Sequence, residues 1–349
     1  MNFVQRMVAA VLAFVLAFAS PALADELAVG VRRITLVDET RSIKPSGKFA
    51  GTPTRQLDLI VWYPAERDGG DAPLSRDGPW PLVIYSHGTF GRADNATHLV
   101  EDLARQGYVV VAPNHPLTSS AAFTRVEAPD ISDVVNQTRD ISFIVDRMLA
   151  DAFFAPAIDR AKIGTMGHSL GAVTDYFVSY GGQTRDARIA ATVLIGAGDP
   201  VQAALSTEMG LAGTWHVVSG VPALFLSAEK DIFARMTGGP YAAYARIGAP
   251  KYEAMIARGV HVWFRDGTEQ PADGKNPDCL FFERMQPGVP IPGCEERTPL
   301  IAPARQQEIT RAAVRTFFDA YLKRDAGALA RLRGLDREFG EVSLRREDE

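Results

Sequence analysis

The chain has 349 residues with a formal net charge of −5, and 46% of its residues are hydrophobic. This length allows one large α/β domain or two small ones, and the hydrophobic content is sufficient for a large core. The charges are spread along the chain without a basic block. The sequence therefore lacks the charge pattern of a nucleic-acid-binding protein, and we expect no nucleic-acid partner.

The first residues resemble an export signal. Arg6 precedes an apolar run at residues 7–19, and a small-residue cleavage site at residues 22–24 follows. We predict a signal peptide at residues 1–24 and a protein that is periplasmic or secreted, with no stable membrane span after cleavage. An uncleaved membrane anchor is the alternative, which the length of the run disfavours because a span needs about 20 apolar residues.

Short β-rich runs alternate with amphipathic runs along the rest of the chain. This alternation is typical of an α/β fold in which a mostly parallel central sheet is flanked by helices on both faces. The first two strands are expected to be antiparallel, and nearly continuous apolar runs such as "PLVIYS" indicate strands buried on both faces. The expected strands are at residues 33–38, 57–64, 81–86, 108–113, 161–166, 189–197, 221–229 and 251–256.

Apolar residues that recur every three or four positions predict helices at residues 96–107, 131–150 and 303–323, with another after Ser169. The helix at 303–323 would close the domain, which we place at residues 25–325. Residues 326–349 are charged and lose the periodicity, so we predict a mobile C-terminal tail there.

A serine lies between two glycines at the end of one predicted strand. The sequence "GHSLG" places Ser169 in a G-x-S-x-G pattern between that strand and a helix, which is the setting of a nucleophile elbow. Ser169 is therefore the candidate nucleophile. Leu170 is a candidate oxyanion donor, because its backbone N–H lies at the positive end of the helix that follows.

A serine hydroxyl needs a base to remove its proton. In folds with this elbow the chain order is serine, then an acidic residue, then histidine. His216 and His261 follow Ser169 in the chain. His216 precedes the strand expected to carry the acid, so the order favours His261, which follows the last predicted strand, as the base.

The acid should orient the imidazole and offset its positive charge. Asp231 follows the predicted strand at residues 221–229 and precedes His261 by 30 positions, so it is the preferred candidate. Asp199, which follows the preceding strand, and Glu229 are the alternatives.

The second oxyanion donor is expected in the loop after the strand at residues 81–86. That loop reads "HGTFGR", and Gly88 allows the backbone to approach a substrate closely. We predict the Thr89 N–H as the donor. Phe90, His168 and Trp263 are the candidates for the walls of the substrate pocket.

Cys279 and Cys294 are the two cysteines of the chain and flank a loop rich in proline and glycine. In an exported protein this pair predicts a disulfide, with two reduced thiols as the alternative. No cysteine or histidine cluster accompanies the pair, so no metal site is predicted. The bridge is expected to stabilise the fold without a chemical role.

Several of these sequences together resemble a known family. "LIVWYPA", "PLVIYSHGTFG", "GYVVVAPNHP" and "GHSLGA" are similar to the platelet-activating-factor acetylhydrolase and predicted dienelactone hydrolase group, over about residues 27–323. The resemblance implies an α/β-hydrolase fold and a serine esterase with oxyanion donors at Thr89 and Leu170. "SAEKD" is similar to the acid-bearing turn of bacterial polyester hydrolases and cutinases, which favours Asp231.

The chain departs from that family at two points. Dienelactone hydrolases have a cysteine nucleophile where this chain has Ser169, so a dienelactone substrate is not implied. In the acetylhydrolases the acid can follow the earlier strand, which keeps Asp199 as the alternative acid.

These observations predict an exported serine carboxylic ester hydrolase for short- to medium-chain or lipid-like esters, without a cofactor. The same three residues would also serve an acyltransferase or a peptidase, because they select neither the acceptor nor the bond cleaved. An inactive hydrolase fold that acts as a binding module is the alternative from another class. The sequence does not predict the oligomeric state.

Overall fold

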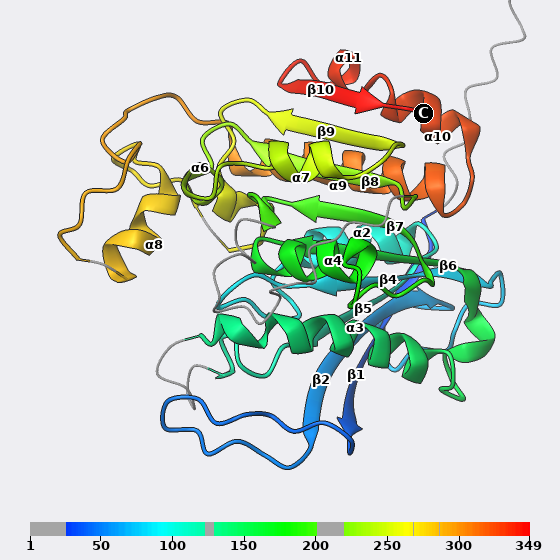
Figure 1. Cartoon of the computed structure of the whole chain (residues 1–349). Helices are drawn as coiled ribbons and strands as arrows, with labels where there is room; N and C mark the ends of the chain where they lie inside the picture. Colours follow the sequence, from blue (N-terminus) through cyan, green and yellow to red (C-terminus); the bar gives the residue numbers. More distant parts are fainter. Residues whose placement is uncertain (1–25, 123–128, 201–219, 268, 286) are drawn as a thin grey trace, which may run out of the picture.

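A ten-stranded mixed sheet runs through the part of the chain that the structure describes (Figure 1). The structure is a computed structural model and describes residues 26–122, 129–200, 220–267, 269–285 and 287–349. The predicted signal peptide at residues 1–24 and His216 lie outside the described residues. The strand order is β10-β9-β8-β7-β6-β4-β5-β2-β1-β3.

The centre of the sheet is parallel, as predicted. Apart from the polar start of β6 at residues 159–162, its strands are almost entirely buried because helices cover both faces, which explains their apolar sequences. They are β4 (Trp80–Ser86), β5 (Val109–Asn114), β6 (Ile158–His168), β7 (Ile189–Ile195), β8 (Ala223–Ala228) and β9 (Lys251–Ile256).

The predicted antiparallel opening strands lie at one edge of this sheet. β1 (Ala28–Asp38) pairs with β2 (Arg55–Ala65) over its whole length, and β2 pairs antiparallel with β5. The two-residue strand β3 (Gly69–Gly70) adds to β1.

The helices form two layers, and alternate residues of β4 point to each of them. Val83 and Tyr85 pack in the core beneath α2 (Thr97–Arg105) and α9 (Pro303–Tyr321). Leu82 and Ile84 pack in the core beneath α3 (Val134–Met148) and α4 (Leu170–Tyr180). This alternation is the two-residue period of a strand with both faces covered.

Short helices occupy the connections on either side of α3 and those after β8 and β9. η2 (Ile131–Asp133) and η3 (Ala155–Ala157) flank α3, and α6 (Ile232–Met236) and α7 (Tyr241–Arg246) follow β8. The single turn η5 (His261–Phe264) and α8 (Pro277–Met285) follow β9, and α8 extends from one side of the molecule (Figure 1).

The charged C-terminal segment is ordered, so the prediction of a mobile tail at residues 326–349 is wrong. It forms α10 (Ala326–Leu332), α11 (Leu335–Glu338) and β10 (Val342–Glu347), which pairs antiparallel with β9. Leu332 and Leu335 are fully buried in the core, while most of the charged side chains stay at the surface. The few apolar residues are enough to anchor the segment because β9 offers its free edge, which makes β10 the last strand.

Among the residues that the structure describes, no helix combines the length and the hydrophobicity that crossing a membrane requires.

Candidate active site

Ser169 lies at a sharp turn between β6 and α4. Its backbone has φ 57° and ψ −118°, a conformation that costs a non-glycine residue about 1–3 kcal/mol. The close approach of the turn to its neighbours explains Gly171, where a Cβ would lie 2.0 Å from the carbonyl oxygen of Ser86. A Cβ on Gly167 would lie 2.4 Å from the Gly171 backbone. The Ser169 N–H donates to the Ile195 carbonyl at 2.8 Å, so the turn is fixed to β7.

His261 and Asp231 form a buried pair beside this turn. His261 Nδ1 donates to Asp231 Oδ2 at 2.7 Å, and the exposed fractions of the two residues are 3% and 1%. Asp231 also caps α6, because its Oδ1 accepts the Ala234 N–H at 2.8 Å. A carboxylate accepts hydrogen bonds, so Nδ1 carries the proton and Nε2 keeps the lone pair that a general base needs.

The charge state of His261 is set by two opposing effects. Burial disfavours the imidazolium, but the negative charge and the hydrogen bond of Asp231 outweigh burial and raise the pKa of His261. Asp231 therefore makes His261 a stronger base while holding its ring in one orientation.

The alternative acids occupy other positions. Asp199 forms an ion pair with Arg246, whose Nη1 lies 3.0 Å from Asp199 Oδ1. Glu229 is at the surface, and its side chain is 43% exposed. The carboxylate that bonds to His261 is that of Asp231, so the geometry favours the preferred candidate.

The two predicted oxyanion donors flank Ser169. Leu170 is the first residue of α4, and N–H groups in the first turn of a helix have no acceptor within the helix. Thr89 lies in the loop after β4 and lines the same cavity as Ser169. The next residue, Phe90, has φ 59° and donates its N–H to the Thr118 carbonyl at 2.8 Å, which fixes the loop.

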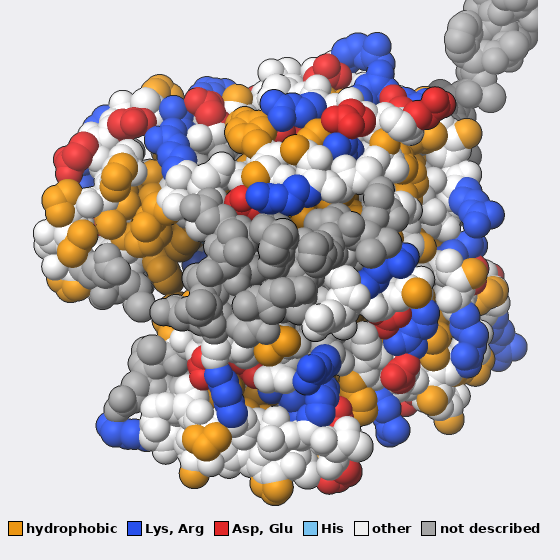
Figure 2. All heavy atoms as spheres, viewed as in Figure 1, with side chains coloured by type: hydrophobic (Ala, Val, Ile, Leu, Met, Phe, Trp, Pro, Cys, Tyr) orange, Lys and Arg blue, Asp and Glu red, His pale blue; other side chains and the backbone are white. Residues whose placement is uncertain are grey.

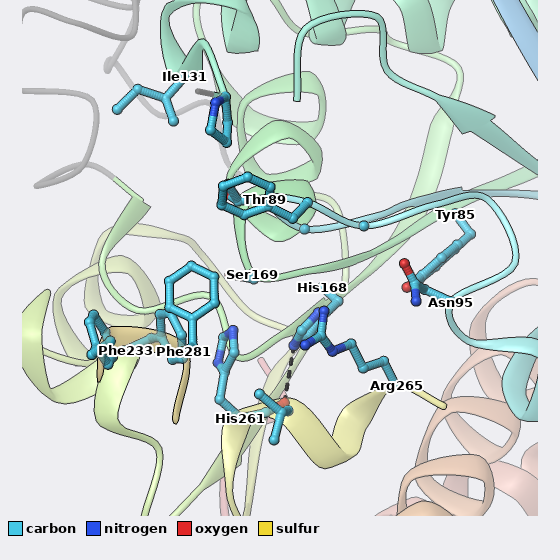
Figure 3. A pocket seen from close by; sticks show the side chains of 16 residues that line it. Tyr85, Thr89, Asn95, Ile131, His168, Ser169, Phe233, His261, Arg265 and Phe281 are labelled. Carbon is cyan, nitrogen blue, oxygen red and sulfur yellow. Dashed lines mark hydrogen bonds between the residues drawn. The ribbon is translucent and has the colours of Figure 1, made fainter. Parts of the chain in front are cut away.

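A cavity of about 390 Å³ opens beside Ser169 and His261 (Figure 3). Of the three residues predicted for the walls of a substrate pocket, Phe90 and His168 line this cavity and Trp263 does not. The Trp263 side chain is fully buried in the core near α9, because residues two apart in the tight turn η5 point in different directions. The sequence analysis missed most of the cavity wall, which includes Tyr85, Asn95, Phe233, Arg265, Phe281 and Phe282.

His168 supports the loop that carries the base. Its ring centroid lies 4.5 Å from that of His261, and its Nε2 donates to the His261 carbonyl at 3.2 Å (Figure 3). Burial and the neighbouring His261 lower the pKa of His168, which keeps its imidazole neutral. We therefore assign it to the wall and to the support of the base, and not to proton transfer.

The fold and part of the sequence are similar to those of known proteins. The structure of a ferulic acid esterase from Streptomyces cinnamoneus matches with a TM-score of 0.65 over 94% of this chain and 98% of that chain, at 21% sequence identity. The chain has the α/β-hydrolase fold. The sequence pattern of the chlorophyllase family matches residues 72–226, less than half of the chain. A search of curated proteins found no match.

A second buried carboxylate lies behind the Asp231–His261 pair, and the sequence did not predict it. Asp278 in α8 is fully buried and accepts three backbone N–H groups. The N–H groups of Ile232 and His261 donate to Asp278 Oδ2 at 3.1 Å each, and the Val262 N–H donates to Asp278 Oδ1 at 3.0 Å. Asp278 thus joins the start of α6 to η5, the two segments that follow the acid and contain the base.

The ionisation of Asp278 is coupled to the same pair. Burial and the charge of Asp231 raise the pKa of Asp278 to about 6, although His261 and the backbone N–H groups oppose that shift. Above that pH its negative charge adds to that of Asp231 and helps to raise the pKa of His261. Asp278 thus holds the backbone of His261 and Val262 and affects the pKa of His261, the predicted base.

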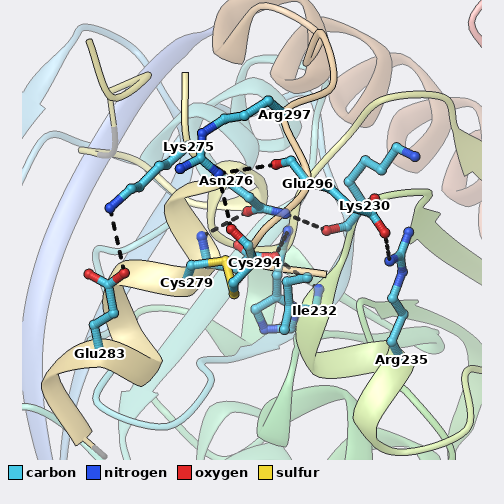
Figure 4. Close-up of a disulfide and its surroundings, with 12 residues drawn as sticks. Lys230, Ile232, Arg235, Lys275, Asn276, Cys279, Glu283, Cys294, Glu296 and Arg297 are labelled. Atoms are coloured by element: carbon cyan, nitrogen blue, oxygen red, sulfur yellow. Dashed lines mark hydrogen bonds and ion pairs between the residues drawn. A yellow bond between two sulfur atoms is a disulfide. The ribbon is translucent and has the colours of Figure 1, made fainter. Parts of the chain in front are cut away.

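The predicted disulfide holds α8 in place (Figure 4). Cys279 and Cys294 are bonded, and Asn276 fastens the start of the helix. Asn276 Nδ2 donates to the Lys230 carbonyl at 2.7 Å, while its Oδ1 accepts the Asp278 N–H at 2.9 Å. Cys279 directly follows Asp278 in the chain, so the bridge lies near the Asp231–His261 pair although it is distant from Asp231 in the sequence.

Replacing Asp278 with asparagine should shift the pH dependence of activity. A neutral residue no longer raises the pKa of His261, so the acid limb of kcat/KM should move to lower pH. An amide oxygen cannot accept all three N–H groups, so kcat/KM at the optimum should also fall, by about 10-fold for a net loss near 1.4 kcal/mol. Both effects are measured in one pH–rate profile.

Asp273→Asn is the matched control for this variant, because Asp273 lies in the same segment and is exposed. It should leave the profile of the wild type in place. An Asp278→Asn enzyme with an unshifted acid limb and normal kcat/KM would show that Asp278 has no influence on the base.

Replacing both cysteines with serine should reduce stability and activity together. Opening a loop with a sequence separation of 15 costs about 3 kcal/mol in the chain-entropy model, which lowers Tm by roughly 5–10 °C. Activity should fall even well below Tm, because α8 carries Asp278 and the cavity residue Phe281. Tm and kcat/KM of the double variant at 15 °C test this. Full activity with a lowered Tm would restrict the bridge to the purely stabilising role expected from the sequence.

Proposed function

We propose that this protein is an exported serine carboxylic ester hydrolase, with Ser169 as nucleophile, His261 as general base and Asp231 as the acid that orients the base. One observation carries the proposal. Ser169 at its elbow and the Asp231–His261 pair belong to one site, and Ser169 and His261 line the same cavity. The assignment to the platelet-activating-factor acetylhydrolase and predicted dienelactone hydrolase group is a further part of this proposal.

In the proposed reaction, Ser169 Oγ attacks the ester carbonyl carbon while His261 Nε2 takes the hydroxyl proton. The bond to the alcohol oxygen then breaks, and Nε2 gives that proton to the departing alcohol. The acyl group remains on Oγ. A water molecule attacks the acyl carbon and loses a proton to Nε2, and Oγ recovers a proton as the carboxylic acid departs.

The backbone N–H groups of Thr89 and Leu170 would stabilise the oxyanion that forms twice in this sequence. Both positions are set by the backbone, so the donors do not need to reorganise as negative charge develops. A single donor of this type contributes about 10²–10³ in kcat.

The composition of the cavity supports esters with a hydrophobic portion. Phe90, Phe233, Phe281 and Phe282 line one end of it. Hydrophobic side chains also gather at the surface over the part of the molecule that contains α6 and α8, where Met236, Leu280 and Val289 are exposed (Figure 2). The structural neighbour, itself named an esterase, is consistent with ester chemistry.

Export is supported by the signal-like residues 1–24 and by the Cys279–Cys294 disulfide, because disulfides persist in oxidising compartments.

A fluorophosphonate probe combined with p-nitrophenyl esters of increasing acyl length tests the proposed function. We expect stoichiometric labelling of Ser169, found by peptide mass spectrometry, together with ester hydrolysis that labelling abolishes. A matched p-nitroanilide and an added alcohol acceptor distinguish a peptidase and an acyltransferase from a hydrolase. Absence of both labelling and turnover would indicate an inactive binding module.

A further inference from the structure

The cavity beside Ser169 has two chemically different ends (Figure 3). The apolar end is formed by the four contacting phenylalanine side chains and Ile131. The opposite end, here called the polar end, is formed by Tyr85, Asn95 and Arg265. In Figure 3 these three residues lie on one side of His168, and Phe233, Phe281 and Ile131 lie on the other.

Arg265 brings an unpaired positive charge to the polar end. Its guanidinium forms no ion pair or hydrogen bond with any residue that the structure describes. The neighbouring carboxylate of Asp266 is already engaged, because it accepts from His98 Nδ1 at 2.5 Å and from the Thr97 N–H at 2.6 Å. Burial lowers the pKa of Arg265, and the negative charge of nearby Asp278 opposes that shift only in part.

Tyr85 supplies a second donor without a partner. The residue is only 1% exposed, and its hydroxyl is buried with no hydrogen-bond partner among the described residues. Buried polar groups in folded proteins are nearly always paired, so an orphan hydroxyl in a cavity wall points to a ligand. Arg265 lines the same cavity as Tyr85 and lies on the same side of His168 (Figure 3).

Asn95 supplies a third donor. Its side-chain oxygen accepts the backbone N–H of Arg92, so the amide NH₂ group remains for a ligand. The polar end therefore presents a guanidinium, a hydroxyl and an amide NH₂. This is the donor set that suits an oxyanion, and a planar guanidinium matches a carboxylate in particular.

We propose that Arg265, Tyr85 and Asn95 form a carboxylate-binding subsite, so that the preferred substrates are small esters with a free carboxylate on one side of the ester and a hydrophobic group on the other. This inference rests on the proposed function. The carboxylate would bind at the polar end while the ester carbonyl lies at Ser169 and the hydrophobic group lies at the apolar end. A cavity volume of about 390 Å³ can hold a small molecule that carries all three groups.

Two pairs of esters test the subsite from both sides of the ester bond. The acyl-side pair is p-nitrophenyl hydrogen glutarate and its terminal carboxamide, and the alcohol-side pair is the butyrate ester of 4-hydroxybenzoate and that of 4-hydroxybenzamide. In one of the pairs the carboxylate should give a kcat/KM about 10- to 100-fold higher than the carboxamide, the size expected for charge-assisted hydrogen bonds. Equal values within both pairs would overturn the proposal.

Variants assign the preference to the residues. Arg265→Gln should remove most of the carboxylate preference, whereas Arg67→Gln, at an exposed arginine in the turn after β2, should retain it. Tyr85→Phe removes a hydroxyl that bonds to no described residue, so it should fold normally and reduce the preference several-fold. An unchanged preference in both Arg265→Gln and Tyr85→Phe would overturn the proposal.

Binding measurements separate this inference from the proposed function. Calorimetry with 4-hydroxybenzoate and 4-hydroxybenzamide reports on the subsite even if no ester is hydrolysed. The carboxylate should bind about 10- to 100-fold more tightly to the wild type than to Arg265→Gln, and the carboxamide should not discriminate between them. Absence of hydrolysis with this binding pattern would contradict the esterase and retain the subsite. Hydrolysis without this binding pattern would support the esterase and contradict the subsite.

Discussion

Ser169→Ala should lower kcat/KM for a p-nitrophenyl ester by about 10⁴- to 10⁶-fold, the range expected when the nucleophile of a serine hydrolase is removed. The chemistry has no second route, because the acyl-enzyme needs Oγ. The fold should be unaffected, since the backbone of the elbow is held by the Ser169 N–H to Ile195 bond and by the close approach of Gly171 to Ser86. Initial rates and a thermal melt of the same preparation measure both quantities.

Ser179→Ala is the matched control for this variant. Ser179 lies in the same helix, is fully buried and has a hydroxyl without a hydrogen-bond partner among the described residues. Its replacement should keep near wild-type activity. A purified Ser169→Ala enzyme that turns over esters at the rate of Ser179→Ala would exclude the serine mechanism.

Asp231→Asn should lower kcat/KM by about 10³- to 10⁴-fold. The amide NH₂ group would face His261 Nδ1 as a donor, so the ring would have to present a lone pair there and carry its proton on Nε2. The base would then be protonated on the nitrogen that must accept the serine proton. Loss of the carboxylate charge should also lower the pKa of His261, so the remaining activity should persist to more acidic pH than in the wild type.

Asp199→Asn is the control that separates the two acids suggested by the sequence. Asp199 pairs with Arg246, so its replacement should reduce stability slightly and lower kcat/KM by less than about tenfold. A larger loss of activity in Asp199→Asn than in Asp231→Asn, with both variants folded, would transfer the role of the acid to Asp199.

The Asp231 and Asp278 variants address different steps in the control of one base. Asp231 contacts the ring of His261, whereas Asp278 holds the backbone of η5 and acts on the ring through its charge. Asp231→Asn should therefore affect the tautomer and the pKa, and Asp278→Asn should affect the pKa and the position. The disulfide variant should disturb the position of His261 indirectly, because it loosens α8 and with it Asp278.

Local patterns in the amino-acid sequence were enough to predict several features of the fold and of the site. Continuous apolar runs predicted the parallel strands, because strands covered on both faces have no polar side. The G-x-S-x-G turn predicted the placement of Ser169, because a turn this tight requires small neighbours. Chain order then selected His261 from the two histidines that follow the serine. Each of these predictions depends on residues within one strand, turn or helix, or on the order of these elements along the chain.

Other features depend on contacts between residues that are far apart in the chain. Asp231 and Asp199 both follow parallel strands, and only the position of η5 shows which carboxylate reaches His261. The C-terminal segment forms β10 because β9 leaves an edge open, which the charged sequence around Leu344 does not indicate.

No local sequence pattern singles out Asp278, Tyr85 or Arg265. The roles proposed for them depend on burial beside groups that are far away in the chain. The free energy of a buried charge or hydrogen-bond donor depends on the groups that surround it. Those groups come together only when the chain folds.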